Sequence, residues 1–209
     1  MGNHLRNEAV IAAVETAKAL VFDFDGTLVD SNEIKWSGFE HVFSEFKEWL
    51  PEISAYCRGN NHTMRGEKFR YVCEQILHIA YTPERQRSLH ERYAAYTTEA
   101  VARAPEIPGA AELIRQVRDR PTALLSSTPH EILLEILNRK GWQSMFGVVQ
   151  GAPVVKRDWL EVFRSGIGCG PSDILFFGDT EEDAASAHAF GSVFVRVGVT
   201  IKDFRELLN

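Results

Sequence analysis

The chain contains 209 residues, with 23 basic and 29 acidic side chains, so its formal net charge is −6. This length suits one domain, or one domain with a substantial insertion, and the shares of hydrophobic residues (44%) and charged residues (25%) are close to globular averages. The composition argues against intrinsic disorder, and the acidic balance argues against a protein that mainly binds nucleic acid. Charged residues interrupt every apolar stretch before the roughly 18 residues that a membrane helix needs, so no membrane span is predicted.

The cysteines and the first residues give expectations about location. Cys57, Cys73 and Cys169 are odd in number and far apart, which is a poor pattern for a disulfide framework or a zinc site. Reduced thiols are typical of the cytosol, and a cytoplasmic location is predicted. The first residues carry no convincing targeting signal, and apolar residues at helical spacing between Val10 and Ala17 predict a short amphipathic helix instead.

Compact apolar runs alternate with helical patterns along most of the chain. Helical patterns open at Pro108-Gly109 and at Pro129, and another covers about 181–190. Unbroken apolar strands that alternate with helices are typical of a parallel sheet with helices on both faces, so an α/β fold is predicted. The predicted strands are residues 19–22, 122–125, 174–177 and 193–195.

The stretch from 32 to 105 interrupts this alternation, because it has helical patterns and no clear strand. Apolar and aromatic residues recur at helical spacing over 39–49, 69–77 and 89–100, and the polar segment 58–66 predicts a loop between the first two helices. Residues 32–105 are therefore predicted to form an inserted helical module, with 1–31 and 106–209 forming the α/β core.

Polar side chains follow the predicted strands at their carboxyl ends, which is where open parallel sheets bind ligands. Carboxylates there suit a hard cation such as Mg²⁺, whereas hydroxyls and an ammonium suit an anion. The sequence thus predicts one site assembled from four distant segments. Its candidate residues are Asp23, Asp25, Ser126, Ser127, Lys156, Asp179 and Asp183.

In chain order, these segments resemble the four motifs of the haloacid dehalogenase (HAD) superfamily. The first motif matches Asp23-Phe24-Asp25-Gly26-Thr27-Leu28-Val29-Asp30-Ser31, the second matches Ser126, the third Lys156, and the fourth, of G-D-x-x-x-D form, the run 178–183. The helical insertion lies where the phosphoglycolate phosphatase-like branch carries its cap, so the resemblance covers almost the whole chain. It implies a HAD-like Rossmannoid parallel sheet with an inserted, all-helical cap.

The resemblance implies a Mg²⁺-dependent phosphatase, a phosphoric monoester hydrolase, that acts through an aspartyl-phosphate intermediate. Asp23 would be the nucleophile, and Asp25 would be the general acid and then the general base. The side chains of Asp23 and Asp179 and the backbone carbonyl of Asp25 would bind the Mg²⁺.

The resemblance also implies how the substrate is held. The phosphoryl oxygens would be bound by Thr27, Ser126, Ser127 and Lys156, and Asp183 would orient Lys156 or a metal-bound water. In the cap segment, Arg65 and His62 are candidate contacts for the non-phosphate part of the substrate, with a solvated polar loop as the alternative interpretation.

Asp25 bears most directly on the reaction class. Dehalogenases of this superfamily and its phosphonatase-like members lack an aspartate two residues after the nucleophile, so Asp25 favours phosphate-ester chemistry. Two positions depart from the common pattern: Ser126-Ser127 stands where Thr-Asn is frequent, and Arg157 follows Lys156 where proline is common.

Two other functions stay open from the sequence. One is a phosphotransferase or sugar-phosphate mutase of the same fold, and the other is a non-catalytic regulatory protein that binds a phosphate ligand. The expected partner is a small phosphorylated metabolite, with no nucleic acid and no membrane, for a monomer or homodimer.

Overall fold

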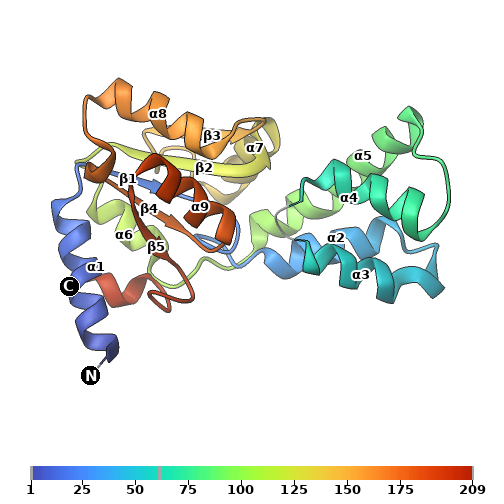
Figure 1. The fold of residues 1–209 in the computed structure, drawn as a ribbon, viewed down its shortest axis with the longest axis horizontal. Helices are drawn as coiled ribbons and strands as arrows, with labels where there is room; N and C mark the ends of the chain where they lie inside the picture. Colours follow the sequence, from blue (N-terminus) through green and yellow to red (C-terminus); the bar gives the residue numbers. More distant parts are fainter. Residues whose placement is uncertain (1, 61–62, 209) are drawn as a thin grey trace. The chain divides into compact units, whose positions relative to one another are not determined.

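The computed structural model describes residues 2–60 and 63–208, which fold into two compact units (Figure 1). The first unit combines Met1–Asp30 with Ala104–Asn209, and the second is Ser31–Arg103. The second unit is thus a single continuous segment inserted into the first.

A parallel five-stranded sheet forms the centre of the first unit, in the order β3-β2-β1-β4-β5 (Figure 1). The central strand β1 pairs with β2 on one side and β4 on the other, so that Leu20 lies opposite both Thr122 and Leu175. This confirms the predicted α/β class. The strands are β1 (Ala19–Phe22), β2 (Thr122–Pro129), β3 (Val148–Ala152), β4 (Ile174–Gly178) and β5 (Val193–Arg196).

Helical segments cover both faces of this sheet. Alternate side chains of each buried strand point to opposite faces, so both faces carry apolar side chains that need covering. On one face, Val21 packs in a core with Leu160 of α8 (Lys156–Ile167) and Ala187 of α9 (Glu181–Phe190). On the other face, the rings of Phe22 and Phe177 stack at a centroid distance of 5.2 Å, and both contact the ring of Phe204 in η4. The remaining elements are α1 (Gly2–Thr16), α6 (Ala110–Gln116), α7 (His130–Lys140), η3 (Pro171–Asp173) and η4 (Phe204–Leu207).

Three elements of the first unit differ from the sequence prediction. Strand β3 was not predicted, because Val148–Ala152 contains Gln150 and Gly151 in place of an apolar run and lies at the edge of the sheet. Helix α8 was not predicted either, although its buried Leu160 and Phe163 are spaced three residues apart. Strand β2 continues past the predicted end to Pro129, with an irregular register between Leu125 and Pro129.

The second unit is entirely helical over the residues that the structure describes. Its core contains Phe39, Phe43, Phe69 and Tyr93, whose rings contact one another edge-on or tilted. The elements are α2 (Asn32–Val42), η1 (Lys47–Trp49), α3 (Leu50–Gly59), α4 (Arg65–Tyr71), the π-helical turn η2 (Val72–Ile76) and α5 (Pro83–Arg103).

The predicted boundaries within this unit are partly wrong. The first predicted helix breaks after Val42, and a new helix begins at Leu50, where Pro51 occupies a position in the first turn that needs no backbone donor. The predicted loop at 58–66 is shorter than expected, because Gly59 ends α3 and Arg65 already begins α4.

Two general expectations can be compared directly with the structure. Among the described helices, none is long and apolar enough to cross a membrane. Cys57, Cys73 and Cys169 are all buried free thiols.

Candidate active site

Asp23 lies directly after the central strand, where its backbone N–H donates to the carbonyl oxygen of Phe177 in β4 at 2.8 Å. Its side chain is only 7% exposed. The chain then turns tightly, with Gly26 in the left-handed region (φ 76°) that side chains disfavour. This turn returns Thr27 to the strand end, where its hydroxyl lies 3.3 Å from Asp23 Oδ2 and 3.3 Å from Asp179 Oδ1. A single hydroxyl hydrogen can satisfy one of these carboxylates at a time.

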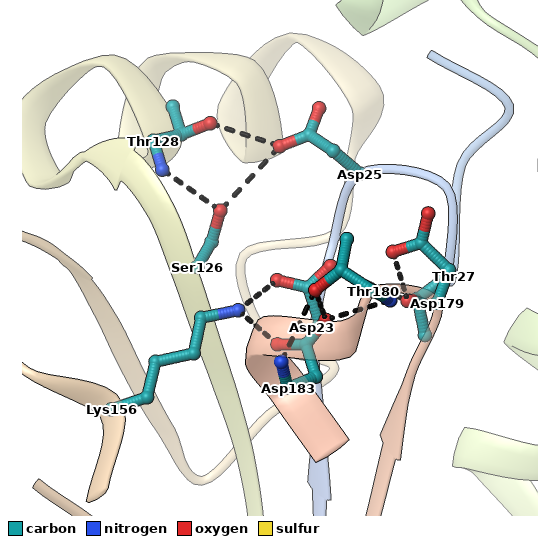
Figure 2. Close-up of polar contacts among 9 residues, drawn as sticks. All are labelled: Asp23, Asp25, Thr27, Ser126, Thr128, Lys156, Asp179, Thr180 and Asp183. Atoms are coloured by element: carbon teal, nitrogen blue, oxygen red, sulfur yellow. Dashed lines mark hydrogen bonds and ion pairs between the residues drawn. The ribbon is translucent and has the colours of Figure 1, made fainter. Parts of the chain in front are cut away.

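Lys156 is the buried cation of the site. It is the first residue of α8, and its Nζ donates to Asp23 Oδ1 at 2.7 Å and to Asp183 Oδ1 at 2.5 Å (Figure 2). The two carboxylates come from different elements, so the ammonium ties the end of β1 to the first turn of α9.

Asp183 also forms the beginning of α9. The hydroxyl oxygen of Thr180 accepts the backbone N–H of Asp183, and Asp183 Oδ2 accepts the backbone N–H of Thr180 at 3.2 Å and its hydroxyl at 2.6 Å. This reciprocal arrangement is a capping box. It requires glycine at 178, because a Cβ there would lie 2.5 Å from the Cβ of Asp183. Both carboxylate oxygens of Asp183 have protein partners, since Oδ1 accepts from Lys156 and Oδ2 accepts from Thr180.

Asp25 lies in a second group of side chains, beside the end of β2 (Figure 2). Its Oδ2 accepts the hydroxyl of Thr128 at 2.9 Å and lies 3.5 Å from the hydroxyl of Ser126. The Ser126 oxygen in turn accepts the backbone N–H of Thr128 at 3.1 Å. The side chains of Asp25, Ser126 and Thr128 are buried, whereas Ser127 is exposed.

Sequence reasoning missed Thr128, although a signal for it was present. In an extended strand, residues two apart point to the same side, so Thr128 shares the direction of Ser126 while Ser127 points the other way. Because the apolar run ends at Leu125, the predicted strand stopped before this alternation could be used.

The charges at the site are unbalanced. Burial raises the pKa of Asp23; Lys156 acts in the opposite direction, while Asp183, Asp179 and Asp25 raise the pKa further. For Lys156, burial opposes the charged form, but Asp23 and Asp183 outweigh it and raise the pKa. The ion pair itself thus favours the charged form of both partners, and the rise at Asp23 comes from burial and the surrounding carboxylates.

A group of carboxylate oxygens at this site has the geometry of a cation site. Asp23, Asp179 and Asp183 each contribute one carboxylate oxygen, and these three oxygens lie within 4.8 Å of one another. Lys156 offsets only part of the charge of these carboxylates, so a divalent cation would relieve the remaining negative charge.

Of the two residues predicted to contact the non-phosphate part of the substrate, the structure describes Arg65 alone. Arg65 is half-buried within the second unit, with its guanidinium 4.9 Å from the centre of the Tyr93 ring. Burial lowers its pKa, and its Nε is buried without a hydrogen-bond partner among the described residues. His62 lies outside the residues that the structure describes.

Comparison with known proteins identifies relatives over nearly the whole chain. The family model for haloacid dehalogenase-like hydrolases matches residues 17–191. A phosphoglycolate phosphatase from Synechococcus elongatus is 27% identical over 197 residues, covering 91% of this chain and 88% of that protein.

Two solved structures share the fold. A predicted phosphoglycolate phosphatase from Haemophilus somnus aligns with a TM-score of 0.71 at 18% identity, over 92% of this chain and 97% of that one. The L-2-haloacid dehalogenase from Xanthobacter autotrophicus aligns with a TM-score of 0.62 at 19% identity, over 87% of this chain and 78% of that one. Because proteins named for different reactions share this fold, the fold alone does not specify the reaction.

Proposed function

This chain belongs to the haloacid dehalogenase-like hydrolase family, and we propose that it hydrolyses the phosphate ester of a small metabolite through an aspartyl-phosphate on Asp23. The observation that carries this proposal is the pair of buried carboxylates at the end of β1, with Asp23 bound to Lys156 and Asp25 bound to hydroxyls. A nucleophile next to an ammonium and a separate acid/base group are what phosphate-ester hydrolysis needs.

In the first step, a carboxylate oxygen of Asp23 attacks phosphorus and forms the new O–P bond. The ester P–O bond breaks, its electron pair goes to the departing oxygen, and Asp25 gives that oxygen a proton. Lys156 holds the phosphoryl oxygens and reduces their repulsion with Asp23. The hydroxyls of Thr27 and Ser126 complete the proposed phosphate-binding set. Ser127, which the sequence also suggested for this set, is exposed and points to the other side of the strand, so its side chain is not included.

In the second step, water attacks the phosphorus of the aspartyl-phosphate. Asp25, now ionised, takes the proton from that water, and the Asp23–phosphorus bond breaks with its electron pair returning to the carboxylate. Inorganic phosphate leaves, and both aspartates regain their starting protonation states.

The acidic side chains fit a Mg²⁺ ion. Asp23 and Asp179, with the backbone carbonyl of Asp25, are the proposed ligands. Asp183 is a weaker candidate because its Oδ1 lies 2.5 Å from Lys156 Nζ and its Oδ2 accepts two hydrogen bonds from Thr180. Its proposed role is instead to hold Lys156 in place through the 2.5 Å contact. When bound, Mg²⁺ supplies positive charge that offsets the negative charge of the transferring phosphoryl group.

Phosphate release from purified protein is the first test. Phosphoglycolate is the first substrate to try, because the Synechococcus elongatus relative carries that name, followed by phosphorylated sugars and nucleotides. We expect release of inorganic phosphate from at least one compound and, after an acid quench, phosphorylation of the peptide that contains Asp23 by mass spectrometry. Asp23→Asn should show neither signal. Phosphate release that persists in Asp23→Asn would contradict the proposed nucleophile.

Arg65 is proposed to contact the non-phosphate part of the substrate, because its buried Nε is a donor without a partner among the described residues. Arg65→Ala should reduce kcat/KM for the best substrate at least about tenfold, and p-nitrophenyl phosphate should be affected much less because it lacks a polar group there. Steady-state kinetics on both compounds measure this difference. Arg70→Ala, an exposed position of the same helix, is the matched control. Equal losses on both compounds would indicate a role in folding or in the cap alone.

A further inference from the structure

Thr128 forms a hydrogen bond with the proposed acid/base group. Its hydroxyl donates to Asp25 Oδ2 at 2.9 Å, while the Ser126 hydroxyl lies 3.5 Å from the same oxygen. Thr128 is buried, so water does not compete freely for this hydrogen bond. Figure 2 shows the Thr128 and Ser126 hydroxyls on the same side of the Asp25 carboxyl group.

The end of β2 is shaped to bring these two hydroxyls together. Leu125 pairs with Gln150 and Pro129 pairs with Ala152, so β2 contains two more residues than β3 over this interval. Such an irregularity redirects side chains at a strand end. The Thr128 backbone N–H also donates to the Ser126 oxygen at 3.1 Å, which fixes the two residues relative to each other.

We propose that Thr128 is a positioning residue that orients Asp25 for proton transfer to the leaving group. This inference rests on the proposed function, in which Asp25 is the acid and then the base. In this proposal, the hydroxyl of Thr128 holds Oδ2, and Oδ1 exchanges protons with the substrate. Without this bond, the carboxyl group rotates about its terminal torsion, whose energy profile is broad.

In both steps, the proton is then transferred at one oxygen, Asp25 Oδ1. In the first step, the O–H bond at Asp25 Oδ1 breaks, the proton goes to the departing ester oxygen, and that oxygen keeps the electron pair of the broken P–O bond. In the second step, Oδ1 receives a proton from the water that attacks the aspartyl-phosphate. Thr128 keeps its own proton throughout and acts only by holding the carboxyl group of Asp25.

The test compares leaving groups that differ in their need for a proton. An alkyl phosphate departs as a strongly basic alkoxide, whereas p-nitrophenolate leaves without protonation. Thr128→Val removes the hydroxyl with little change of shape, and we expect the ratio of kcat/KM for the alkyl ester to kcat/KM for the aryl ester to fall at least about tenfold. Thr128→Ser, which keeps the hydroxyl, should restore most of the wild-type ratio.

The matched control is Thr122→Val in the same strand, where the hydroxyl is buried and accepts the Gly147 N–H at 3.2 Å. It should leave the ratio unchanged. If Thr128→Val does not fold by circular dichroism, Thr128→Ala gives the same comparison with less crowding. An unchanged ratio in a folded Thr128 variant, while Asp25→Asn lowers it, overturns the positioning role and leaves the proposed function standing. An unchanged ratio in Asp25→Asn itself overturns the acid/base role, and this inference with it.

Discussion

Chelation of divalent cations is expected to abolish phosphate release, and Mg²⁺ is expected to restore it. Burial and three neighbouring carboxylates raise the pKa of Asp23, so a cation beside Asp23 and Asp179 would favour the ionised form of this proposed nucleophile. Activity should therefore fall to background in excess chelator and recover on addition of Mg²⁺. Ca²⁺ should not restore it, because its larger and more flexible coordination shell would misplace Asp23 relative to phosphorus.

A binding measurement separates this metal effect from a loss of folding. Titration calorimetry of chelator-treated protein should detect Mg²⁺ binding that is lost in Asp179→Asn while the thermal unfolding transition is retained. Glu182→Gln, an exposed acidic position in the first turn of α9, is the matched control and should keep both binding and activity. Full activity in excess chelator would exclude the metal assignment.

Asp25→Asn is expected to affect esters according to the basicity of their leaving group. Asparagine has the shape of aspartate but cannot donate an acid proton at neutral pH, so kcat/KM should fall about 100-fold or more for an alkyl phosphate. The fall should be much smaller for p-nitrophenyl phosphate, because kcat/KM reports the steps through the first irreversible one. Steady-state kinetics on the two esters give both values.

The same variant should show burst kinetics on the aryl ester. Since the water that hydrolyses the aspartyl-phosphate has lost its base, a rapid release of p-nitrophenol should precede a slow steady state, with phosphate retained on Asp23. Asp23→Asn should show neither burst nor turnover. Equal losses of kcat/KM on both esters, without a burst, would assign Asp25 a role in shaping the site and not in proton transfer.

Much of the core fold could be predicted because its strands are buried on both faces. The runs at 19–22 and 174–177 are continuous apolar segments, and the structure contains strands there as β1 and β4. Edge strand β3 carries no such signal, since Val148 is exposed and Gly151 adds no apolar surface. Periodicity alone also failed at Val42, where a helix ends although apolar residues continue through Phe46.

The residues proposed from the sequence as the site came from strand ends and from a family resemblance. The structure places Asp23, Lys156 and Asp183 in one hydrogen-bonded group. The partners of Asp25 were harder to foresee, because they depend on how β2 continues beyond its apolar run. Alternation along an extended strand places Thr128 on the same side as Ser126, but residue types alone do not encode the register shift at the end of β2. Contacts of this kind arise from tertiary pairing.

The central position of β1 has a consequence for how catalytic competence is acquired. Its two pairing partners lie about 100 and about 150 residues further along the chain, whereas the cap is one continuous segment. During synthesis, the cap can form its aromatic core from residues that are close in sequence. Strand β1 cannot pair until β2 and β4 have been synthesised. Contacts between distant parts of a chain pay a larger loop-closure cost and form slowly. The proposed nucleophile Asp23, the ammonium of Lys156 and the proposed metal ligand Asp179 therefore come together only when the last third of the chain has joined the sheet. A nascent chain released before β4 would contain the complete cap and Asp23, but it would lack Asp179 and Asp183 of the proposed site.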